Sequence, residues 1–237
     1  MTHTLHRTRN LAGQGEEFIL LSMAAQGYNN RGSEDKFRET FRIMLKHRPV
    51  NAGDDNIGGI LTGRTVEEIL SHANGKSYMA AVYDDREQAE AALRELKAVN
   101  LGLSVVVTGE REVVFDLLQR AGLTPHTVNM SLGYMGKVEK LPAPEVLDIT
   151  SMCGHAMVCP DHVGYVLRQV RGGRMSARDG AVELARPCTC AMFNPSRAEA
   201  LLTEICRRRR AAGVATADGP PPAGVTEIAP DDGGGRS

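Results

Sequence analysis

The chain has 237 residues, of which 42% are hydrophobic, and its formal net charge is -1 at pH 7. This length supports one substantial core, or one α/β domain with a small appendage. The balanced charge and ordinary hydrophobic content argue against global disorder and against a dominant polyanion-binding role, so we predict no nucleic acid partner. Apolar runs are too short for a membrane-spanning helix, and residues 1–14 lack a signal peptide's apolar stretch, which predicts a cytoplasmic protein without a membrane partner.

Strands and helices are predicted to alternate after the first 15 residues. Residues 18–25 form an almost continuous apolar run, and a helical pattern of buried positions follows after Ser33, a candidate N-cap. Two further apolar runs, at 78–82 and 103–107, each precede a helical pattern, at 89–99 and 110–121. Hydrophobic residues then alternate over 126–132, which predicts a fourth strand at a sheet edge.

This alternation decides the predicted fold class. Strands joined by helices of about 12 residues are typical of right-handed crossovers and of parallel sheets covered on both faces. We therefore predict an α/β fold with a mainly parallel open sheet of about four strands and helices on both faces. A ferredoxin-like arrangement with a mixed sheet is the alternative, because the pattern does not define strand order.

The pattern changes at residues 141–144, which read Leu-Pro-Ala-Pro. Short helices separated by cysteine-bearing turns follow, which predicts a small all-helical module at the C-terminal side. The predicted division is a disordered tail at 1–15, an α/β domain that binds substrate or effector at 16–142, a helical metal or iron-sulfur module at 143–210, and a second disordered tail at 211–237.

Four of the five cysteines lie in the predicted helical module: Cys153, Cys159, Cys188 and Cys190. An odd cysteine count without an export signal indicates metal ligands or free thiols rather than disulfides. Structural zinc sites commonly place two to four residues between paired cysteines, and neither pair here has that spacing. The leading prediction is an iron-sulfur cluster of the 4Fe-4S type, with zinc as runner-up and buried core thiols as the third interpretation.

The number of ligands decides the chemistry of such a cluster. Four cysteines close it, whereas three leave one iron free to act as a Lewis acid. Cys159 is the candidate for a dispensable ligand, because Pro160 after it can begin the next helix. Cys206 is expected to be a bystander.

Two residues outside the cysteine set are candidates for chemistry. His155 lies two positions after Cys153, so it is the predicted catalytic acid or base, or a ligand. Arg64 ends a glycine-bearing segment that has P-loop spacing but lacks its lysine, and the segment is interpreted as a plain turn. Beside a helix N-terminus, Arg64 is the predicted binding residue for a small anionic substrate.

The predicted function is therefore a cytosolic iron-sulfur enzyme of the lyase, dehydratase or desulfurase type. The alternatives are an electron-carrying or sensing iron-sulfur module, and a zinc-binding protein in which the metal is structural.

Overall fold

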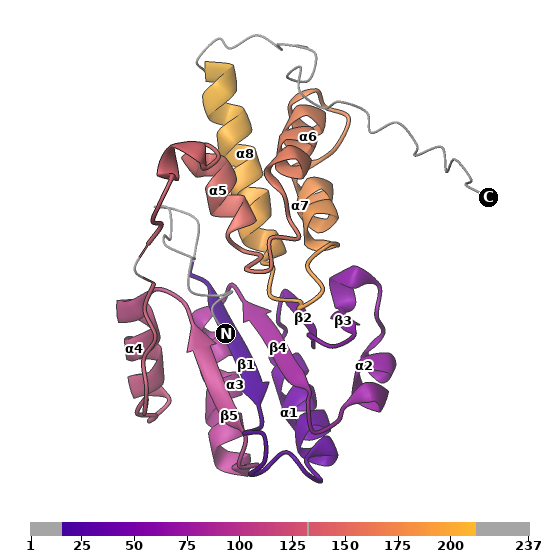
Figure 1. Cartoon of the computed structure of the whole chain (residues 1–237), viewed down its shortest axis with the longest axis vertical. Coiled ribbons are helices and arrows are strands. Elements are labelled where there is room, and N and C mark those ends of the chain that lie inside the picture. The colour runs from indigo at the N-terminus through magenta and orange to yellow at the C-terminus, as the bar shows by residue number, and fades with distance from the viewer. Residues whose placement is uncertain (1–15, 132, 212–237) are drawn as a thin grey trace, which may run out of the picture.

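The computed structural model describes residues 16–131 and 133–211. It combines one sheet with helices on both of its faces, and Figure 1 shows the later helices gathered on one side of the sheet. The predicted tails lie outside the described residues, except residue 211, which ends the last helix. None of the helices within the described ranges is long and apolar enough to cross a membrane.

The sheet has five strands in the order β3-β2-β4-β1-β5. Every pair of neighbouring strands is antiparallel. The strands are β1 (Phe18–Met23), β2 (Asn51–Asp54), β3 (Gly58–Gly59), β4 (Tyr78–Tyr83) and β5 (Ser104–Thr108). The prediction of a mainly parallel sheet with about four strands is therefore wrong.

The connections explain this error. Helix α1 (Glu34–Lys46) joins β1 to β2, which point the same way because both are antiparallel to β4 between them. Helix α3 (Arg86–Val99) joins β4 to β5 in the same manner across β1. Each crossover thus skips one position, which an antiparallel strand fills. The order β1-α1-β2-β4-α3-β5 has the ferredoxin-like topology that was the alternative, although the sheet is antiparallel rather than mixed.

One face of the sheet packs against the helices of the first half. Phe18 and Leu20 of β1 point to this face together with Met79 and Ala81 of β4, as expected from the two-residue period of a strand. The helices that cover it are α1, α3, α2 (Val66–His72) and α4 (Arg111–Arg120). The predicted stripe of α3 is buried at Ala89, Ala92, Leu93 and Leu96, but not at Val99.

The opposite face carries the second half of the chain. Ile19 and Leu21 of β1, with Ala80 and Val82 of β4, share a core with four helices. These helices are α5 (Pro144–Thr150), α6 (Pro160–Arg171), α7 (Ala177–Ala185) and α8 (Pro195–Ala211). Because the helices and the sheet share this core, residues carried by both can meet at the same place.

Two local segments also differ from the prediction. Residues 126–131 form no strand, and Leu132 lies outside the described residues. Conversely, the polar residues that precede the glycine-bearing segment, where no strand was predicted, form strand β2. One polar atom of each buried side chain finds a partner: Asp54 Oδ1 accepts from the Tyr78 backbone N–H at 3.2 Å, and Asn51 Nδ2 donates to the Phe193 carbonyl at 2.9 Å. Asn51 Oδ1 and Asp54 Oδ2 have no hydrogen-bond partner among the described residues.

Candidate metal centre

Three cysteine thiols meet between the sheet and the helices. Cys153 lies in the turn after α5, whereas Cys188 and Cys190 lie in the loop between α7 and α8. All three are buried, with exposed fractions of 3%, 1% and 0%. The Sγ atoms of Cys188 and Cys190 are 3.5 Å apart, and the Cys188 thiol also hydrogen-bonds the Cys153 sulfur. We call these three residues the cysteine trio.

The surroundings of Cys153 favour its thiolate form. The hydrogen bond from Cys188 lowers the pKa of Cys153 to about 5, against the opposing effect of burial. Backbone N–H groups of the turn lower this pKa further by hydrogen-bonding the sulfur; they belong to Met157, Val158 and His155. A sulfur that accepts several N–H bonds is stabilised as an anion, which is the form that binds metals.

Cys190 is the second sulfur held near its anionic form. The hydrogen bond from Cys188 lowers the pKa of Cys190 to about 7, and the Met192 backbone and the His155 side chain act in the same direction. The pKa of Cys188 is raised, because its thiol hydrogen-bonds the sulfurs of Cys153 and Cys190. The cysteine trio thus places one thiol between two thiolate-favouring sulfurs, and a thiophilic cation can replace the shared proton.

This arrangement predicts a thiolate at neutral pH in the metal-free protein. Since its pKa is lowered, Cys153 should keep its thiolate ultraviolet absorbance until the pH falls through about 5. The Cys153→Ala variant should lack this component, whereas Cys159→Ala, at an exposed cysteine, should keep it. If the absorbance were lost already near pH 9, the usual thiol value, the turn around Cys153 would not stabilise an anion.

His155 and Asp55 lie at the edge of the cysteine trio. One ligand-type atom each from Asp55, His155 and Cys190 lie within 4.8 Å of one another. His155 is exposed and Asp55 is half-buried, so these two groups form the more open side of the cluster. The structure thus places the predicted His155 beside two of the predicted cysteines.

Asp55 is a residue of this cluster that was not predicted from the sequence. It directly follows β2, where residues two apart point to the same face, so Asp55 shares a face with Asn51 and Gly53. That face meets the cysteine loop, as the bond from Asn51 to Phe193 shows. The two-residue period could have identified Asp55 only if residues 51–54 had been recognised as a strand.

Close packing holds the loop that carries Cys188 and Cys190. Ala191, in this loop, has a positive φ of 57° and its Cβ lies against Gly53 and Gly59 of the hairpin β2-β3. A Cβ on Gly53 would lie 2.7 Å from the Ala191 Cβ, and a Cβ on Gly59 would overlap it as well. After the loop, Asn194 Oδ1 accepts from the Arg197 N–H at 3.0 Å and caps α8. The hairpin glycines therefore let the cysteine loop approach the sheet.

The remaining cysteines have different environments. Cys159 is exposed and occupies the N-cap position of α6, immediately before Pro160. Cys206 is buried in α8. Among the described residues, the thiol contacts of the trio do not include Cys159.

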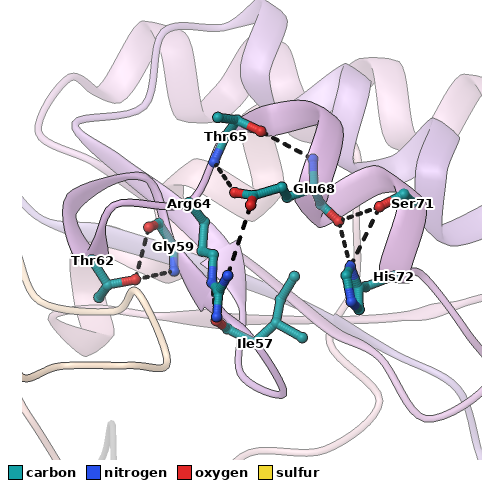
Figure 2. A network of polar contacts seen from close by, with 8 residues as sticks. All are labelled: Ile57, Gly59, Thr62, Arg64, Thr65, Glu68, Ser71 and His72. Atoms are coloured by element: carbon teal, nitrogen blue, oxygen red, sulfur yellow. Dashed lines mark hydrogen bonds and ion pairs between the residues drawn. The ribbon is translucent and has the colours of Figure 1, made fainter.

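Arg64 is held in a local network, which Figure 2 shows. Its Nε donates to the Ile57 carbonyl at 2.9 Å, and its Nη1 lies 3.8 Å from a Glu68 carboxylate oxygen. Glu68 also accepts from the Thr65 N–H at 2.8 Å, while Thr65 Oγ1 accepts from the Glu68 N–H, which forms a capping box for α2. These contacts fix Arg64 beside the start of α2, whereas the segment interpreted as a plain turn contains strand β3 and a 3-10 helix at Ile60–Thr62.

Comparisons with protein families, with curated proteins and with solved structures yield no match to this chain.

Proposed function

We propose that the protein binds a metal centre through the cysteine trio, with a single zinc ion as the first candidate. The observation that supports this proposal is the convergence of three buried sulfurs, two of them 3.5 Å apart. Two thiolates on one tetrahedral ion with Zn–S bonds of about 2.3 Å lie about 3.8 Å apart. Small side-chain adjustments would therefore let Cys188 and Cys190 bind the same ion.

Such a centre has a structural consequence. It would link the turn after α5, which carries Cys153, to the loop between α7 and α8. Metal binding to a site that the unfolded chain lacks adds its free energy to folding. The centre would thereby stabilise the packing of α5–α8 on the sheet.

An iron-sulfur cluster is the second candidate, and the N–H bonds to Cys153 favour it because cluster-bound sulfurs commonly accept such bonds. Three ligands would leave one iron open, as in the predicted lyase, dehydratase or desulfurase. In this case Cys188 and Cys190 would bind different irons and their sulfurs would have to separate. The electron-carrying alternative would need a fourth ligand besides the trio.

The predicted anionic substrate belongs to this second candidate. Arg64 donates through Nε to the Ile57 carbonyl and lies 3.8 Å from Glu68, so it would have to bind such a substrate through its remaining N–H groups. A cytoplasmic location and the lack of a nucleic acid partner stay predictions from the sequence.

Metal analysis tests the proposal. We expect protein purified without oxygen to contain about one zinc per chain and no visible absorbance, because Zn²⁺ has a filled d shell. A brown protein that contains iron and acid-labile sulfide would instead support the iron-sulfur cluster. Folded protein that contains neither metal, and takes up neither on reconstitution, would refute the proposal. The cysteine trio would then be interpreted as buried core thiols.

A further inference from the structure

The centre is surrounded by more donor groups than one ion can use. Three thiols, one imidazole and one carboxylate gather here, from Cys153, Cys188, Cys190, His155 and Asp55. Protein zinc sites are almost always four-coordinate, and catalytic ones use three protein ligands with an open fourth position. At least one of the five groups must therefore lie outside the coordination sphere.

Burial separates these groups into two sets. The three sulfurs are at most 3% exposed, whereas His155 is exposed and Asp55 is half-buried. One ligand-type atom each of His155 and Asp55 lies within 4.8 Å of the Cys190 sulfur, so these two residues form the solvent side of the cluster. Three buried thiolates would fill three of the four positions of a tetrahedral ion, and the remaining position would face this open side.

We propose that the cysteine trio supplies all the protein ligands, and that the fourth position opens towards solvent between Asp55 and His155, where it takes a small ligand from solution. This inference rests on the proposed metal centre. It distinguishes a centre that binds small molecules from one that is only structural.

Charge identifies the class of ligand. Three thiolates outweigh a divalent cation by one negative charge, and the Asp55 carboxylate adds another nearby. Arg64, the predicted anion-binding residue, lies in the network with Ile57 and Glu68 before α2 and is not among the donor groups gathered at the centre. An anion is therefore disfavoured. A neutral protic molecule, such as an alcohol or a thiol, can bind through its oxygen or sulfur and donate a hydrogen bond towards Asp55.

Cobalt substitution tests the open position. Co²⁺ would replace the native metal in the full-length protein, and its thiolate charge-transfer and d–d bands would report its ligands. We expect 2-mercaptoethanol to change these bands saturably: its sulfur takes the fourth position with the S–H bond intact, so the molecule stays neutral and its S–H donates to the Asp55 carboxylate. Azide should produce a much weaker change. If the Co²⁺ bands stayed unchanged when the thiol was added, and Co²⁺ remained bound after desalting, the inference would be overturned.

Variants separate the remaining explanations. In His155→Ala the charge-transfer bands of three thiolates should persist, whereas a centre with His155 as its fourth ligand would lose Co²⁺ affinity and show changed d–d bands, which would refute an open position. Asp55→Asn should change the apparent thiol affinity by about tenfold, and the exposed Asp84→Asn should not. Failure of the wild-type protein to bind Co²⁺ would instead refute the proposed metal centre itself.

Discussion

Replacing the central thiol, in Cys188→Ala, is expected to weaken zinc binding by at least about a hundredfold. Structural zinc sites contribute about 10–16 kcal/mol of apparent binding free energy, shared among about four ligands, so the loss of one thiolate removes several kcal/mol. Cys188 also donates the hydrogen bonds that lower the pKa values of Cys153 and Cys190, so its loss weakens both remaining sulfurs as anions. Competition with a chromogenic zinc chelator measures the change.

Cys159→Ser is the matched control for this experiment. Cys159 lies in the same helical part of the chain but is exposed at the start of α6, so its replacement should leave the affinity within about twofold. Serine also caps helices well, which keeps α6 intact. If Cys159→Ser removed the metal as completely as Cys188→Ala, four cysteines would hold the centre and the trio would be incomplete.

Adding one methyl group to the hairpin, in Gly59→Ala, is expected to destabilise the fold by about 3 kcal/mol or more. The new Cβ would overlap the Ala191 Cβ and lie 2.6 Å from the Ala52 backbone oxygen, neither of which is the end of a flexible side chain. Relief requires the cysteine loop to move away from the sheet. The variant should therefore lose both unfolding free energy, measured with urea, and zinc affinity.

Two further variants make this prediction specific. Gly164→Ala, within α6, should leave the unfolding free energy unchanged or raise it by up to about 1 kcal/mol, because alanine favours a helix more than glycine does. The added Cβ would meet only the end of the Arg168 side chain, at 3.5 Å. Ala191→Gly should partly rescue Gly59→Ala by removing one of the two overlaps. Wild-type stability and zinc affinity in Gly59→Ala would show that the loop does not depend on contact with the hairpin.

The sequence identifies most of the individual elements. Apolar runs and helical periods locate β1, β4, β5 and α1, α3, α4, because these signals depend only on which face of each element is buried. Direction within the sheet carries no such signal, since a buried strand has the same composition in either orientation. The antiparallel pairing of β1 with β4 was therefore not predictable, and neither was β2, whose burial depends on hydrogen bonds to Tyr78 and Phe193.

The same division applies to the candidate site. The sequence alone determined which thiols were candidates, because four cysteines are concentrated in a short helical segment, with His155 beside Cys153. Only the tertiary structure separated Cys159 from the trio and added Asp55 from the sheet. These outcomes depend on residues a hundred or more positions apart in the sequence, such as Asp55 with His155 and Cys190. Their proximity arises from packing both halves of the chain on one sheet, and local sequence patterns do not encode it.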